Sequence, residues 1–164
     1  MTSIPFDPVN HLAPLPFQKE LCLMAQRMRQ SGLAWTPHVG CFVWDPGGRI
    51  KSPSPFPERI YFILSMPRFL EIFGSIDAMV DDLIWLPTWH QARLTAQALG
   101  VPAEVLAEAE SRHWQVPGDD LKWLYGCIND ALGREAPGTV SAGLIDEGHL
   151  ESLYISAVGH QLGD

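Results

Sequence analysis

The sequence predicts a mostly helical α+β fold, with a small antiparallel sheet of about three strands packed against five to seven helices. Segments rich in β-branched and aromatic residues flank a Pro-Gly turn in the first half of the chain. Apolar residues at helical spacing, punctuated by capping residues and glycines, fill most of the second half. Hydrophobic residues make up 46% of the 164 residues, which is normal for a globular protein and argues against global disorder.

Three strands are expected, at residues 39–44, 49–51 and 59–65. The turn between the first two is the segment Asp45–Gly48 (Asp-Pro-Gly-Gly), in which proline fixes one dihedral and glycine permits positive φ. Three prolines in residues 52–57 remove backbone donors and predict an extended loop. The third strand, Arg59–Ser65, is rich in β-branched and aromatic residues.

Helices are predicted from apolar periodicity, together with their start and stop residues. Thr88 and Gln91 match a capping box, and Gly32, Gly74 and Gly100 stand where helices should end. The expected ranges are 16–31, 67–74, 75–84, 88–99, 102–112, a helix from Asp119 or Asp120 to near Gly133, and a last helix over residues 150–158. The proline-rich residues 1–14 should form an extended arm, and residues 1–164 a single domain.

The charge of the chain indicates which partners it is expected to avoid, and its cysteines indicate the cellular compartment. The net charge is −8, and residues 76–164 carry fourteen Asp/Glu against four Lys/Arg. Such an acidic half repels phosphate backbones and anionic lipid, so neither nucleic acid nor membrane is an expected partner. Three widely spaced cysteines fit reduced thiols in the cytoplasm, and no apolar run approaches the roughly 20 residues of a membrane span.

No motif in the sequence points to a metal, a cofactor or a known catalytic centre. His38 and Cys41 have ligand-like spacing, but a zinc site wants four ligands and no second pair accompanies them. Nucleophile elbows, phosphate-binding loops and dinucleotide fingerprints are missing. Neither a metal site nor a cofactor is therefore predicted.

Aromatic residues are the most informative feature for function. Trp85, Trp89 and His90 fall within six residues, and buried tryptophans need a partner for their N–H groups. Clustered tryptophans can close a core, line a pocket or anchor a partner. The residues predicted to contact a ligand or partner are Trp44, Trp85, Trp89, His90, His38 and Cys41.

Three functions follow as hypotheses. The leading one is a non-catalytic protein-interaction module or self-associating accessory protein, because the chain is poor in charge and rich in tryptophan. The alternative is a small-molecule binding protein or enzyme whose pocket lies between sheet and helices near His38, Cys41, Trp44 and His90. A helix-turn-helix DNA regulator over residues 88–112 is disfavoured, since residues 102–111 contain no Lys or Arg.

Overall fold

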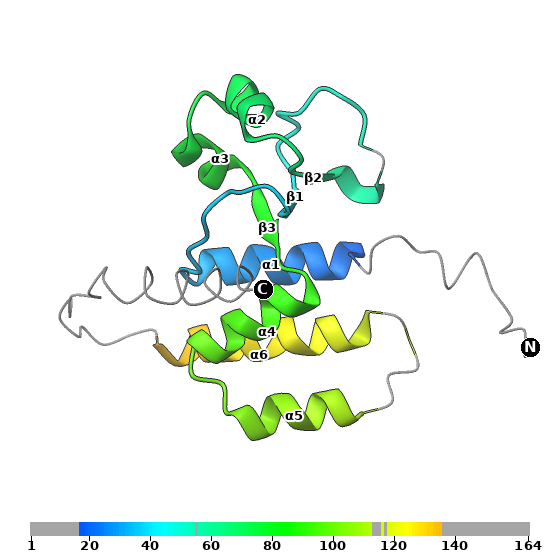
Figure 1. The fold of residues 1–164 in the computed structure, drawn as a ribbon, viewed down its shortest axis with the longest axis vertical. Helices are drawn as coiled ribbons and strands as arrows, with labels where there is room; N and C mark the ends of the chain where they lie inside the picture. The colour runs from blue at the N-terminus through cyan, green and yellow to red at the C-terminus, as the bar shows by residue number, and fades with distance from the viewer. Residues whose placement is uncertain (1–16, 55, 113–115, 117, 136–164) are drawn as a thin grey trace, which may run out of the picture.

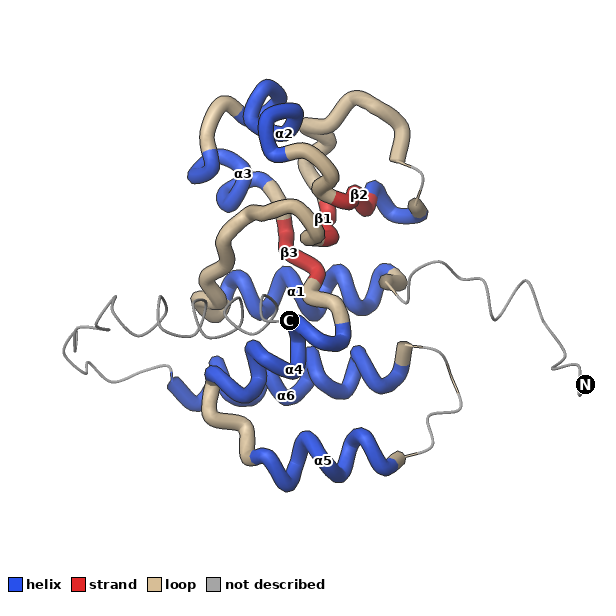
Figure 2. Tube along the Cα trace, in the orientation of Figure 1, coloured by secondary structure: helices blue, strands red, loops and turns tan. Residues whose placement is uncertain are grey.

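A three-stranded antiparallel sheet lies between two groups of helices in the computed structural model, which describes residues 17–54, 56–112, 116 and 118–135 (Figures 1 and 2). The predicted class, mostly helical α+β with three antiparallel strands, is confirmed. The described elements are α1 (Lys19–Gln30), β1 (Phe42–Trp44), the 3-10 turn η1 (Pro57–Arg59), β2 (Ile60–Phe62), α2 (Met66–Phe73), α3 (Ile76–Asp82), β3 (Ile84–Leu86), α4 (Trp89–Ala98), α5 (Ala103–Ser111) and α6 (Asp119–Glu135).

The sheet separates two hydrophobic cores, because successive side chains of a strand point to opposite faces. On β1, Trp44 belongs to the core shared with α1, α4, α5 and α6, whereas Val43 belongs to the core beneath α2 and α3. In Figure 1 the first helix group lies below the sheet and the second above it. Helix α6 packs against both α1 and α4, and so holds the larger core together.

One of the three predicted strands is wrong, and a different segment takes its place. Residues 49–51 do not form a strand, because the Asp45 carboxylate accepts the backbone N–H groups of Arg49 and Ile50 at 3.1 and 2.9 Å. Those donors are no longer available for a β-ladder. The Asp45–Gly48 turn does form, with Gly48 at φ 70°, but it leads into a loop and not into a hairpin.

The third strand is β3, which begins at Ile84, where the helix predicted over 75–84 was expected to end. Ser75 caps α3 as expected and accepts the Ala78 N–H at 3.1 Å, but the helix ends at Asp82. Pro87 disfavours a helical conformation at the residue before it, which favours an extended path for this segment. Strand β1 is central, pairing Val43 with Tyr61 of β2 on one side and with Trp85 of β3 on the other.

Most helix boundaries follow the predicted signals. The capping box of α4 is complete, since the Thr88 N–H donates to Gln91 Oε1 at 2.9 Å and Thr88 Oγ1 accepts the Gln91 N–H at 3.5 Å. Gly74 ends α2 with φ 85°. The predicted arm at residues 1–14 and the helix at 150–158 lie outside the described residues.

Candidate functional site

An open groove of about 400 Å³ lies beside the smaller core and is walled by two tryptophans. We call it the tryptophan groove. Its lining comes from the loop after α1, from β3 and from the end of α4. The lining residues are Leu33, Ala34, Trp35, Thr36, His38, Trp85, Thr95, Ala98 and Leu99.

The end of α1 directs this loop toward the sheet. Gly32 takes the left-handed conformation at φ 92°, which ends the helix without a Cβ clash. The next N–H, that of Leu33, donates back to the Met28 carbonyl at 3.0 Å and fixes the reversal. Trp35 therefore reaches the face of the sheet on which Trp85 lies, and both pack against the smaller core.

The two indoles stack on one another, with ring centroids 6.1 Å apart and planes inclined by 7°. Both Nε1 atoms are shielded from solvent, and neither has a hydrogen-bond partner within the described ranges. A buried N–H without an acceptor costs about 1–3 kcal/mol, so natural proteins rarely leave one unpaired. Two such donors in one stacked pair are unusual, and because both atoms are shielded, the groove presents the indole rings and not these N–H groups.

The remaining polar side chains of the groove are those of His38, Thr36 and Thr95. His38 Nδ1 lies 2.8 Å from the Val39 carbonyl oxygen, an acceptor, so this nitrogen carries a proton in that contact. The Thr95 hydroxyl donates to the Gln91 carbonyl at 2.8 Å. None of the lining residues is Asp, Glu, Lys or Arg. The groove therefore offers mostly apolar surface walled by two indole rings.

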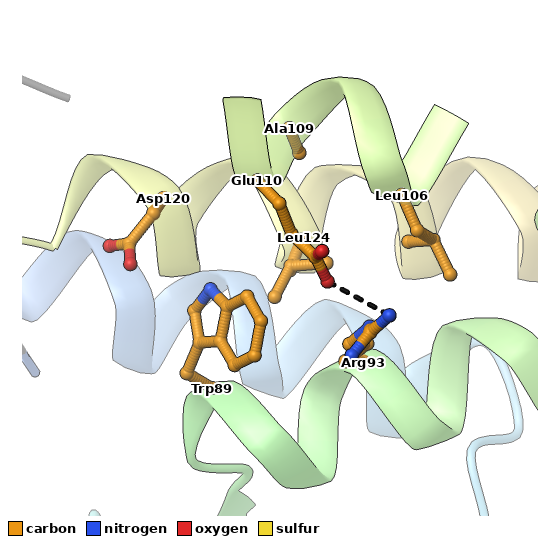
Figure 3. A pocket seen from close by; sticks show the side chains of 7 residues that line it. All are labelled: Trp89, Arg93, Leu106, Ala109, Glu110, Asp120 and Leu124. Carbon is orange, nitrogen blue, oxygen red and sulfur yellow. Dashed lines mark ion pairs between the residues drawn. The ribbon is translucent and has the colours of Figure 1, made fainter. Parts of the chain in front are cut away.

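A second, smaller pocket of about 130 Å³ lies where α4, α5 and α6 meet. Figure 3 shows the Trp89 ring between the Asp120 carboxylate and the Arg93–Glu110 ion pair, whose charged atoms are 2.8 Å apart. The Arg93 guanidinium also lies 5.8 Å from the centre of the Trp89 ring. Because the ion pair joins α4 to α5, we assign this pocket a structural role in holding α5 against the bundle.

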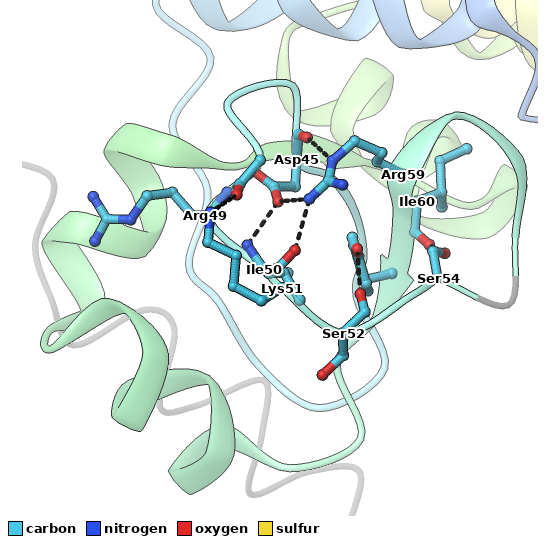
Figure 4. A network of polar contacts seen from close by, with 10 residues as sticks. Asp45, Arg49, Ile50, Lys51, Ser52, Ser54, Arg59 and Ile60 are labelled. Carbon is cyan, nitrogen blue, oxygen red and sulfur yellow. Dashed lines mark hydrogen bonds and ion pairs between the residues drawn. The ribbon is translucent and has the colours of Figure 1, made fainter.

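A third polar feature surrounds the fully buried Asp45 (Figure 4). Arg59 donates through one terminal nitrogen to the Asp45 carboxylate at 2.9 Å and to the Ile50 carbonyl at 2.7 Å. Burial alone raises the pKa of Asp45, but the hydrogen bonds from Arg59, Ile50 and Arg49 outweigh it and lower this pKa below the usual 3.8. Every contact of the carboxylate is internal, so the network anchors the loop and has no atoms to spare for a ligand.

The six residues predicted from sequence are distributed over several places. His38 and Trp85 line the tryptophan groove, and Trp89 lines the smaller pocket. His90 is exposed on the first turn of α4. Cys41 and Trp44 are buried in the two different cores, on opposite faces of the sheet, so the structure does not bring His38, Cys41, Trp44 and His90 into one pocket.

The structure adds Trp35, which did not stand out from the sequence because it lies far along the chain from Trp85. A tryptophan just after a helix-ending glycine was the only available signal. The stack forms only because the loop after α1 and strand β3 meet at the sheet. Trp35 and Trp85 thus form a pair that tertiary structure alone creates.

Chemistry at the thiols is restricted by burial. Burial raises the pKa of the Cys41 thiol above its usual 9.0 and outweighs the hydrogen bond at the His38 backbone, which lowers it. Because the thiolate is the nucleophile, this cysteine is poorly reactive at neutral pH. Within the described residues, no three His, Cys, Asp or Glu side chains gather closely enough to hold a metal ion.

Two further findings concern the chain as a whole. Among the described helices, none has the length and apolar character needed to cross a membrane. Comparison of the chain with family models, with curated proteins and with solved structures gives no match.

Proposed function

We propose that this protein is a non-catalytic binding module that recognises a short apolar segment of a partner protein in the tryptophan groove. The observation that carries the proposal is the Trp35–Trp85 stack in the wall of an open groove whose lining contains no Asp, Glu, Lys or Arg. Tryptophans in such positions are typical anchors of protein interfaces.

The lining supports binding more than catalysis. A catalytic site needs a nucleophile, a base or a charged stabilising group aimed at the reacting atoms. Here the only titratable side chain of the groove is His38, and Cys41 is buried in the smaller core. The groove is also lined by neutral residues, which favours a ligand that is itself uncharged along the bound stretch.

A small aromatic molecule is a second candidate ligand for the same groove. The volume of about 400 Å³ falls within the range of about 300–1,000 Å³ typical of small-molecule sites, and aromatic lining is common in them. The site would then consist of Trp35, Trp85 and His38, with the indole rings supplying flat apolar surface.

The compartment and the oligomeric state belong to the same proposal. All three cysteines are free thiols, which supports a reducing compartment such as the cytoplasm. Helix α5 carries Glu104, Glu108 and Glu110 and no Lys or Arg, which supports protein and not nucleic acid as the partner. A second copy of the chain could supply the bound segment as well as a different protein.

The proposal is tested by selecting peptides from a displayed random library on the purified full-length chain. Selected peptides should bind with affinities that fall by at least about tenfold in Ala98→Arg, which places a long charged side chain in the groove. Ala107→Arg is the matched control, because Ala107 is an exposed helical alanine on α5 away from the groove. Peptides that bind Ala98→Arg as tightly as wild type, or a selection without any binder, would overturn the proposal. Binding of aromatic fragments alone would favour the second candidate.

A further inference from the structure

The tryptophan groove lies at an edge of the sheet, and this position supports a more specific inference that rests on the binding function proposed above. We propose that the groove binds an extended segment of a partner protein, which adds a strand to the sheet by pairing with β3. The inference depends on which backbone groups β3 leaves unpaired and on where the groove lies relative to the two cores.

The backbone N–H and carbonyl of Trp85 point away from the sheet. In a central strand, residues that exchange hydrogen bonds with one neighbouring strand alternate with residues that exchange them with the other. The Asp45 N–H donates to the Arg59 carbonyl at 3.1 Å, on the β2 side. Two residues earlier, Val43 therefore also directs its N–H and carbonyl toward β2. Because Val43 stands opposite Trp85, the backbone groups of Trp85 face away from β1.

These two backbone groups of Trp85 remain without a partner. Among the described residues, no hydrogen bond outside the ladder joins the Trp85 N–H or carbonyl to another group. The opposite edge of the sheet differs, because the Ile60 carbonyl of β2 accepts the Ser54 hydroxyl. Unpaired groups on an edge strand are a template for another strand. The edge formed by β3 is therefore the one at which the sheet can be extended.

The lining of the groove shows that it follows this edge. Trp35 and Trp85 pack against the smaller core, whereas Leu99 packs against the larger core. The two cores lie on opposite faces of the sheet, so a groove lined by residues of both must pass the edge of the sheet, and Trp85 places it beside β3. A bound strand would direct alternate side chains toward the two indole rings and toward α4.

The fold also limits the length and the charge of the added strand. Pro87, the next residue that faces outward, has no N–H group, and its carbonyl accepts the Tyr125 hydroxyl at 2.7 Å. On the other side, the Leu83 N–H already donates to the Met79 carbonyl at 2.9 Å. Pairing is therefore centred on Trp85. The lining contains no Asp, Glu, Lys or Arg, so we expect the segment to be uncharged where it pairs.

The test follows the backbone amide of Trp85 in nuclear magnetic resonance spectra of the isotope-labelled full-length chain. The strand probe is Ac-KTVTVTVTK-NH2, and the matched peptide is Ac-KPPPPPPPK-NH2, whose prolines have no N–H group for the Trp85 carbonyl. At saturation with the strand probe, we expect hydrogen exchange of the Trp85 amide to slow by at least about tenfold, because this N–H gains an acceptor. The proline peptide should slow it far less.

Replacing the Trp85 amide by an ester removes the N–H and keeps the indole ring. The affinity for the strand probe should then fall about two- to tenfold, the effect of one lost hydrogen bond. The same replacement at Ile84 is the control, because its N–H faces β1. It should lower the unfolding temperature more than the Trp85 ester does, and the affinity less.

Three results would overturn the inference while leaving the binding function intact. One is a Trp85 amide whose exchange changes neither with the strand probe nor with library peptides that do bind the groove. Another is equal slowing by the proline peptide. The third is exchange that slows as the concentration of the chain alone is raised, which would assign the edge to a second copy of the chain. If no library peptide and neither probe binds, both proposals fail.

Discussion

The buried carboxylate of Asp45 offers a direct test of how the loop after β1 is held. In the variant Asp45→Asn the side chain keeps its shape but has one oxygen instead of two. In the wild-type protein, one carboxylate oxygen of Asp45 accepts the Arg49 N–H and the other accepts the Ile50 N–H. The asparagine NH₂ group must face one of these donors, which then stays buried without a partner.

The expected loss follows from those contacts. A buried donor without an acceptor costs about 1–3 kcal/mol, and hydrogen bonds to a charged group are stronger than neutral ones by about 1 kcal/mol. The Arg59 side chain is 45% exposed and can be solvated after the change, so no uncompensated buried charge remains. We therefore expect Asp45→Asn to lower the free energy of unfolding by about 2–4 kcal/mol at neutral pH.

The same carboxylate predicts a pH dependence. Its pKa in the folded protein lies below the usual 3.8, so the unfolded chain binds the proton more tightly than the folded one. The stabilisation by Asp45 is fully present above pH 3.8 and is lost as the pH falls through the lower folded value. The stability gap between wild type and Asp45→Asn should therefore narrow as the pH is lowered from 5 to about 2.5.

Urea denaturation at a series of pH values measures both effects. Asp82→Asn is the matched control, since Asp82 forms a partly exposed ion pair with Arg49 at 3.0 Å that is worth only about 0–1 kcal/mol. Equal losses for Asp45→Asn and Asp82→Asn at neutral pH would refute the assigned role of the buried carboxylate. A gap that stays constant down to pH 2.5 would refute the assigned direction of the pKa shift.

Three further predictions concern the core, the backbone and the thiols. Tyr125→Phe should lower the free energy of unfolding by about 1–2 kcal/mol, because the buried hydroxyl donates to the Pro87 carbonyl at 2.7 Å; an unchanged urea midpoint would contradict this. Glu58→Gly should leave the stability within about 0.5 kcal/mol of wild type or raise it, since Glu58 has φ 58°, whereas Glu71→Gly within α2 should cost about 1 kcal/mol. Equal losses in thermal unfolding would remove the case for backbone strain. With a thiol reagent at pH 8, Cys127 should be the one cysteine that reacts in the folded protein, because Cys22 and Cys41 are fully buried. Burial also raises the pKa of the Cys22 thiol to about 11. Rapid reaction of all three thiols would show that the cores open.

Local signals in the sequence were sufficient for the helices that the structure describes. The capping box at Thr88 and Gln91, the Ser75 cap and the glycine at position 74 all act within one helical turn. Interactions of this range depend on neighbouring residues alone, which is why helix starts and ends were predicted within a few residues. The mostly helical α+β class followed from the same signals.

The strands were harder to predict, because the conformation of a short strand depends on its hydrogen bonds to neighbouring strands. The segment 49–51 looked like the second arm of a hairpin, but the Asp45 side chain takes its donors. Ile84 was expected to end a helix, and Trp85 and Leu86 were not predicted to form a strand, yet Ile84–Leu86 completes the sheet beside β1. Neither outcome is encoded in a local pattern, since both depend on hydrogen bonds between segments separated in the chain.

The sequence by itself determined the helices, the class of fold and the presence of many tryptophans. It also pointed to Trp85 and His38, which lie in the groove. Only the tertiary structure decided that Trp35 stacks on Trp85 and that neither N–H group meets an acceptor among the described residues. The reason is physical: helix caps are satisfied by near neighbours in the chain, whereas a groove between a loop and a strand exists only after the sheet has brought them together.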